Sequence, residues 1–141
     1  MPNIIKLDMD TPSVQYLCSK DKRLEKVIRM VGPITYTPHH ENPYAFLIHE
    51  IIEQMLSVKA GQKIYNRLET LCDNHISPER ISKLSDSEIR GIGTSSSKVK
   101  CIRAITEAAI SGDLDFDKMN LLSDKEVIAT LTKLHGIGTW T

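Results

Sequence analysis

The sequence predicts an all-α fold, and three observations support this prediction. Helix-start signals recur along the chain, either as a capping side chain ahead of proline or as a capping box. Apolar residues follow these signals at spacings of three and four. No segment sustains the alternation that is typical of a strand. We therefore expect about six or seven helices joined by short connectors.

Each expected helix has its own signal. The start signals are Thr11-Pro12, Asn42-Pro43, Ser77-Pro78, Ser85 with Glu88, and Ser123 with Glu126. The apolar sets are Leu24, Val27, Ile28 and Val31; Phe46, Leu47, Ile51 and Met55; Ile64, Leu68 and Leu71; Val99, Ile102, Ala104, Ile105 and Ala108; and Val127, Ile128, Leu131 and Leu134. The one strand candidate is 34–37, which two prolines bracket within the longest expected loop, 32–42.

Length and charge narrow the class of protein. The chain has 141 residues, which suits one domain, and its 18 basic and 18 acidic side chains give a net charge of zero. A nonspecific electrostatic clamp on a polyanion is therefore disfavoured. The charges are unevenly spread, because Arg90, Lys98, Lys100 and Arg103 occur without an acid among them, and a mostly acidic stretch follows. This pattern fits a phosphate-facing surface or two ordinary solvated helix faces equally well.

Other features indicate a protein without a metal cluster or a membrane anchor. Cys18, Cys72 and Cys101 lack the spacing of a metal site, so we expect three free thiols. No apolar run reaches the length of a membrane span, and the start lacks the regions of a signal peptide. We therefore expect an intracellular protein.

Two short segments, 89–94 and 134–139, share the pattern Gly-Ile-Gly-Thr after a helix. Glycine permits a tight turn and the close approach of another molecule, and amides at a helix start favour a phosphate. Such a device binds a nucleic-acid backbone with little net charge. The alternative is that both segments simply end helices.

The second segment continues as Leu134-His-Gly-Ile-Gly-Thr-Trp-Thr141, which resembles the hairpin of helix-hairpin-helix DNA glycosylases of the 3-methyladenine glycosylase II type. His135 stands where proline is usual in that family. The stretches 51–60 and 84–93 also resemble the family in order and spacing, so the resemblance covers about residues 10–141.

The resemblance implies a helical bundle, incomplete at its C-terminus, in which 1–141 form the N-terminal portion of the glycosylase domain and 134–141 the hairpin. It assigns DNA phosphate contacts to the backbone amides of Gly136, Gly138 and Thr141. It assigns a structural Na or K ion, and no other cofactor, to the backbone carbonyls of Thr132, Leu134 and Ile137. Ser96 occupies the position of the wedge that enters the base stack. Because serine is a poor wedge, either Ile92 or another loop does this job, or base flipping is weaker. Lys98 matches a basic DNA-binding residue, and His39 and His40 are further candidates to probe DNA.

Trp140 indicates the reaction. In related branches this position is a lysine that attacks the sugar, which tryptophan cannot do. An indole can stack on a flipped base, and its cation–π contact with a cationic alkylated purine is worth about 0.5–2 kcal/mol. The resemblance thus implies a monofunctional glycosylase that hydrolyses the N-glycosidic bond of alkylated purines such as 3-methyladenine after base flipping. The alternative is that Trp140 is a core residue.

The sequence contains no catalytic residue that we can assign. The family's catalytic aspartate lies downstream of the hairpin, whereas Asp113, Asp115 and Asp117 precede it. We therefore expect these residues alone to be inactive, and we expect the helix around 127–134 to expose an apolar strip that favours self-association. The expected partner is double-stranded DNA with alkylated bases, in the cytoplasm or nucleoid, or in the nucleus of a eukaryote. The competing interpretations are a noncatalytic helix-hairpin-helix DNA-binding module and a small helical interaction domain.

Overall fold

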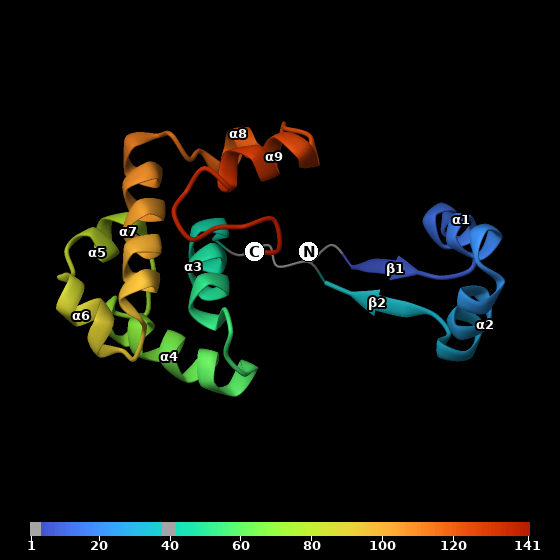
Figure 1. Ribbon diagram of the computed structural model, residues 1–141, viewed down its shortest axis with the longest axis horizontal. Coiled ribbons are helices and arrows are strands. Elements are labelled where there is room, and N and C mark those ends of the chain that lie inside the picture. The colour runs from blue at the N-terminus through green and yellow to red at the C-terminus, as the bar shows by residue number, and fades with distance from the viewer. Residues whose placement is uncertain (1–3, 38–41) are drawn as a thin grey trace. The chain divides into compact units, whose positions relative to one another are not determined.

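The computed structural model describes residues 4–37 and 42–141 (Figure 1). Within these residues lie nine helices and two short strands, so the predicted all-α class is confirmed with one small addition. The chain divides into two compact units, Met1–His40 and Glu41–Thr141. His39 and His40 lie outside the described residues. No helix in the described ranges is long and apolar enough to span a membrane.

The first unit is a two-stranded ribbon joined by a helical pair. Strand β1 (Ile5–Leu7) pairs antiparallel with β2 (Ile34–Tyr36), and α1 (Pro12–Lys20) and α2 (Lys22–Val31) connect them. The candidate strand at 34–37 is therefore confirmed over Ile34–Tyr36, and the loop predicted over 32–42 is wrong at these three positions. Three-residue strands are too short to show a clear alternation in the sequence. Mostly apolar side chains from all four elements line a cavity of about 560 Å³.

The second unit is a helical bundle around one apolar core. Its elements are α3 (Pro43–Glu53), α4 (Val58–Leu71), α5 (Pro78–Ser82), α6 (Asp86–Gly91), α7 (Ser96–Ser111), α8 (Phe116–Met119) and α9 (Asp124–Leu131). Helix α3 packs against α4 and α7, and α7 also packs against α5 and α6. The side chains fully removed from solvent include Ile48, Ile51, Ile52, Leu68, Ile81, Ile89, Ile102 and Ile105. Burying a side chain of this kind contributes about 1.5–3 kcal/mol.

The sequence signals located most of the helix starts correctly. The side chains of Asn42 and Ser77 accept hydrogen bonds from the first turns of α3 and α5, and both predicted capping boxes are present. Thr11 makes no side-chain cap, since its hydroxyl hydrogen-bonds Asp8 instead. These caps satisfy amides that would otherwise lack partners.

The apolar strip predicted for the last helix is only partly exposed. Ile128 is 43% exposed, whereas Leu131 and Leu134 pack against the core of the second unit. Self-association through this face stays a prediction.

Candidate nucleic-acid interface

The two Gly-Ile-Gly-Thr segments each bury their central isoleucine, but their backbones turn at different glycines. The central residues, Ile92 and Ile137, are both buried, with 3% and 7% exposure. In the first segment the second glycine has a positive φ, +110° at Gly93, whereas in the second segment it is the first glycine, +84° at Gly136. The repeat in the sequence therefore gives two different backbone turns around one kind of apolar anchor.

The second segment lies against α7 at a point that admits only glycine. A Cβ on Gly136 would lie 2.9 Å from both Cβ and Sγ of Cys101, and the φ of +84° also disfavours other residues. Cys101 is buried, and burial raises the pKa of its thiol to about 11. Gly138, by contrast, has no atom within 4 Å of a Cβ position.

The hairpin exposes backbone donors. In the described part of the chain, the amides of Gly136, Thr139 and Trp140 donate no hydrogen bond. The amide of Thr141 donates to the Gly138 carbonyl (3.1 Å), and the amide of Gly138 donates to the Thr141 hydroxyl (3.4 Å). The predicted phosphate-binding residues are thus together on one turn, but the amides that lack protein partners are partly different ones.

Gln54 connects the hairpin to α3, a role that we did not predict. Its side-chain amide donates to the Thr141 hydroxyl (2.9 Å) and to the Gly136 carbonyl (3.4 Å). The next residue, Met55, is fully exposed with φ +60°. A non-glycine residue in this region costs about 1–2 kcal/mol. Such strain at an exposed apolar side chain beside the hairpin marks a functional candidate. The sequence analysis instead assigns Met55 to the apolar face of the helix that begins after Asn42, because its spacing fits that pattern.

Lys98 contacts protein in this structure. Its ammonium donates to the carbonyls of Ile52 (2.6 Å) and Gln54 (2.7 Å) at the end of α3. Burial lowers the pKa of Lys98 from its ordinary value. The lysine therefore satisfies carbonyls that have no partner within the helix, and its predicted contact with DNA stays a prediction.

Arg90 and Arg103 of the basic stretch also have partners within the fold. Arg90 donates to the hydroxyl of Ser96, the predicted wedge position at the start of α7. Arg103 binds Asp86 (2.7 Å) and backbone carbonyls. Three of its four cations thus bind groups within the bundle and Lys100 is exposed, so neither a phosphate-facing surface nor two solvated helix faces describes the whole stretch.

Trp140 is fully exposed over the described residues, so its predicted place in a substrate pocket and the alternative of a core residue both stay predictions. Among the residues predicted to hold a cation, the Leu134 carbonyl accepts from the Ile137 amide (3.2 Å) and the Thr132 hydroxyl donates to Ile128 (2.7 Å). These roles stay predictions. Asp115 caps α8, which gives this acidic residue a structural role.

The fold and the hairpin together define a class of base-excision DNA repair protein. Residues 48–141 match the HhH-GPD superfamily of base excision DNA repair proteins, and the chain belongs to this family. The predicted family resemblance is therefore confirmed.

Within this family, the chain is similar to several proteins named as 3-methyladenine glycosylases. The chain is 32% identical over 133 residues to DNA-3-methyladenine glycosylase 1 of Schizosaccharomyces pombe, covering 89% of this chain and 58% of that protein. The crystal structure of a Bacillus halodurans DNA-3-methyladenine glycosidase has a TM-score of 0.85 and 35% identity, covering 96% of this chain and 63% of the other. An S. pombe 3-methyladenine DNA glycosylase in complex with abasic DNA has a TM-score of 0.77 and 30% identity, covering 92% and 66%.

Proposed function

We propose that this protein acts in base excision repair as a monofunctional DNA glycosylase that releases alkylated purines such as 3-methyladenine. The observation that carries the proposal is the exposed hairpin, 134–141, with unpartnered backbone amides next to a fully exposed Trp140. The 3-methyladenine glycosylases to which the chain is similar support the substrate class. Because the chain spans 58% of the curated relative's length, the proposal concerns the protein of which these residues are part.

The hairpin would bind the DNA backbone through neutral groups. Backbone amides that point outward carry partial positive charge and suit a phosphate without a lysine. This accounts for a net charge of zero and for basic side chains that are used within the bundle.

Met55 is the better candidate for the wedge than Ser96. A wedge is an apolar side chain that enters the base stack and offsets the cost of unstacking. Met55 is fully exposed and follows Gln54, which holds the hairpin, whereas the Ser96 hydroxyl accepts from Arg90. A base extruded next to Met55 would leave its place in the duplex occupied by the methionine side chain.

Trp140 accounts for the reaction class. It offers an indole face to a flipped base and lacks the amine that forms a Schiff base. Hydrolysis then passes through a transition state that resembles an oxocarbenium ion. A cationic alkylated purine is already a good leaving group, so its departure requires little acid catalysis.

A monovalent cation at the hairpin also belongs to the proposal. Its ligands would be the carbonyls of Thr132, Leu134 and Ile137, since carbonyl oxygens bind Na or K ions. The Leu134 oxygen already accepts one hydrogen bond, and a carbonyl has a second lone pair for an ion.

A base-release assay tests the proposal. The protein in its natural form is incubated with duplex DNA carrying 3-methyladenine, and the free base is measured against undamaged DNA. We expect base release without strand cleavage, and no covalent adduct with borohydride. Salt-sensitive binding with no base release and no preference for damaged DNA would instead identify a noncatalytic DNA-binding module.

A further inference from the structure

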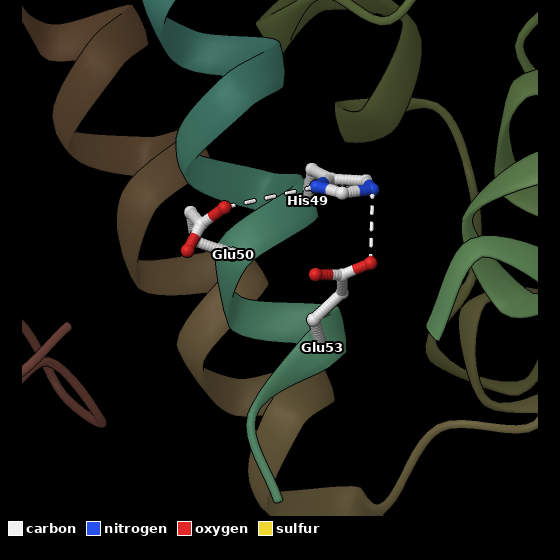
Figure 2. A group of neighbouring side chains, drawn as sticks. All are labelled: His49, Glu50 and Glu53. Atoms are coloured by element: carbon white, nitrogen blue, oxygen red, sulfur yellow. Dashed lines mark ion pairs between the residues drawn. The ribbon is translucent and has the colours of Figure 1, made fainter. Parts of the chain in front are cut away.

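His49 is held in a fixed orientation between α3 and α4. Its ring meets the Tyr65 ring edge to face, with 4.5 Å between centroids and 89° between planes. Its two nitrogens face different groups on opposite sides of the ring (Figure 2). Nδ1 lies 3.8 Å from Glu50 Oε1, and Nε2 lies 3.4 Å from Glu53 Oε1.

A further side-chain oxygen lies close to the same nitrogen and comes from α4. Gln62 Oε1 lies 3.3 Å from His49 Nε2. The amide nitrogen of Gln62 donates to Asn66 (2.7 Å), which turns its oxygen toward the histidine. One imidazole nitrogen and two side-chain oxygens therefore converge from two helices.

The Glu53 carboxylate is the unusual member of this group. Its Oε1 is buried and is the one such side-chain oxygen or nitrogen, over the described ranges, without a hydrogen-bond partner. Burying a carboxylate oxygen without a partner is costly. The glutamate also requires a glycine opposite, because a Cβ on Gly61 would lie 2.5 Å from Glu53 Cγ. A glycine within a helix costs about 0.5–1 kcal/mol relative to alanine.

We propose that His49 Nε2, Glu53 Oε1 and Gln62 Oε1 bind a first-row divalent transition-metal ion such as Zn²⁺. With metal–ligand bonds of about 2.0–2.1 Å, neighbouring ligands of a tetrahedral ion lie about 3.4 Å apart. The observed 3.4 Å and 3.3 Å separations from Nε2 match this edge length. The ion would replace a proton on His49 Nε2 and give Glu53 Oε1, which has an ion pair with His49 but no hydrogen-bond partner, a direct bond.

Glu50 is a positioning residue in this proposal. A metal-binding histidine usually donates its other ring N–H to a carboxylate, which fixes the tautomer. Glu50 Oε1 lies 3.8 Å from Nδ1, an ion-pair distance and not a hydrogen bond, so its charge favours a proton on Nδ1. When the ion is bound, this proton stays on Nδ1 and the Nε2 lone pair binds the ion. The ion would clamp α3 to α4, independently of any activity on DNA.

Titration calorimetry with Zn²⁺ on untagged, chelator-treated protein tests the site. We expect one ion per chain and a higher melting temperature with Zn²⁺. E53Q keeps the shape and removes the charge, and E50Q removes the orienting carboxylate. Each should weaken Zn²⁺ binding by about 10–100-fold. The matched control is H75A, because His75 is an exposed histidine outside the group, and it should bind Zn²⁺ like the parent.

A second readout separates the site from a general effect on folding. Co²⁺ should give the visible absorption of a four-coordinate ion in the parent and in H75A, and lose it in E53Q with an unchanged circular dichroism spectrum. Absence of Zn²⁺ binding by the parent would overturn the proposal. Equal Zn²⁺ affinity of the parent and E53Q would also overturn it, and would leave an adventitious ion only.

Discussion

The ammonium group of Lys98 on α7 lies 2.7 Å from the carbonyl oxygen of Gln54, the C-cap residue of α3. The side chain of Gln54 in turn donates to Thr141 and Gly136 of the hairpin. The lysine therefore supports the hairpin through the end of α3, and several outcomes depend on this chain of contacts.

K98M should lower the free energy of unfolding by about 2 kcal/mol, because charge-assisted hydrogen bonds are lost and two carbonyls keep no partner. Chemical denaturation measures this loss. K100M, at an exposed position of the same helix, should change stability by less than about 0.5 kcal/mol. A lysine on a phosphate behaves differently, since its removal lowers the salt dependence of DNA binding by about one unit of slope. A lower slope with unchanged stability in K98M would show that Lys98 contacts DNA.

G136A should destabilise the protein, whereas G138A should not. Alanine at 136 meets Cys101 at 2.9 Å and must adopt a φ of +84°, so we expect a loss of about 1–3 kcal/mol. Position 138 has free space and no positive φ, so stability should stay within about 0.5 kcal/mol. Thermal or urea unfolding of the pair checks this. Equal stabilities would mean that the hairpin does not pack on α7 as described.

Two substitutions at Met55 separate strain from the wedge. M55G removes a strained φ of +60° and should raise stability by about 1 kcal/mol, whereas M55A keeps the strain and should not. Both lose the apolar side chain and should reduce the preference for abasic over undamaged duplex, measured by fluorescence anisotropy. S96A is the control and should keep this preference. If S96A lost it and M55A kept it, the wedge would be Ser96.

W140A should leave stability unchanged within about 0.5 kcal/mol, because the side chain makes no buried contact. Its effect should be on specificity. Loss of a cation–π contact of about 0.5–2 kcal/mol lowers the preference for a cationic over a neutral base by about 2–30-fold. Competitive base release measures this ratio, and W140F should keep part of the preference. An unaltered ratio in W140A would remove Trp140 from the substrate pocket.

Tyr44 should make the protein sensitive to alkali. Its ring is 2% exposed, its hydroxyl hydrogen-bonds Thr106 at 2.7 Å, and burial raises its pKa to about 12. In the unfolded chain the pKa is about 10, so the unfolded state releases its proton first. The stabilisation that neutral, buried Tyr44 gives to the folded state is therefore fully present below about pH 10. It is lost as the pH rises toward about 12, and each unit of pKa shift corresponds to about 1.4 kcal/mol of unfolding free energy. Y44F, which cannot ionise, should show a flatter loss of unfolding free energy over this range. Identical pH profiles would contradict the assignment.

From the sequence alone, the local features of this protein were predictable. The caps at Asn42, Ser77, Ser85 and Ser123, the apolar spacing and the hairpin motif depend on residues a few positions apart. The family followed from the hairpin, because its residues act through a contiguous stretch of backbone. The all-α class was predictable from the caps and the apolar spacing. The exception is the ribbon, whose strands have three residues each.

Only the tertiary structure decided the long-range partners. Lys98 and Gln54 are 44 residues apart, and Gln54 and Thr141 are 87 apart. A lysine side chain looks the same in a sequence whether it meets a phosphate or a carbonyl. The packing of α3 on α4 and α7 determines which acceptor is within reach, and burial then determines how firmly it is held.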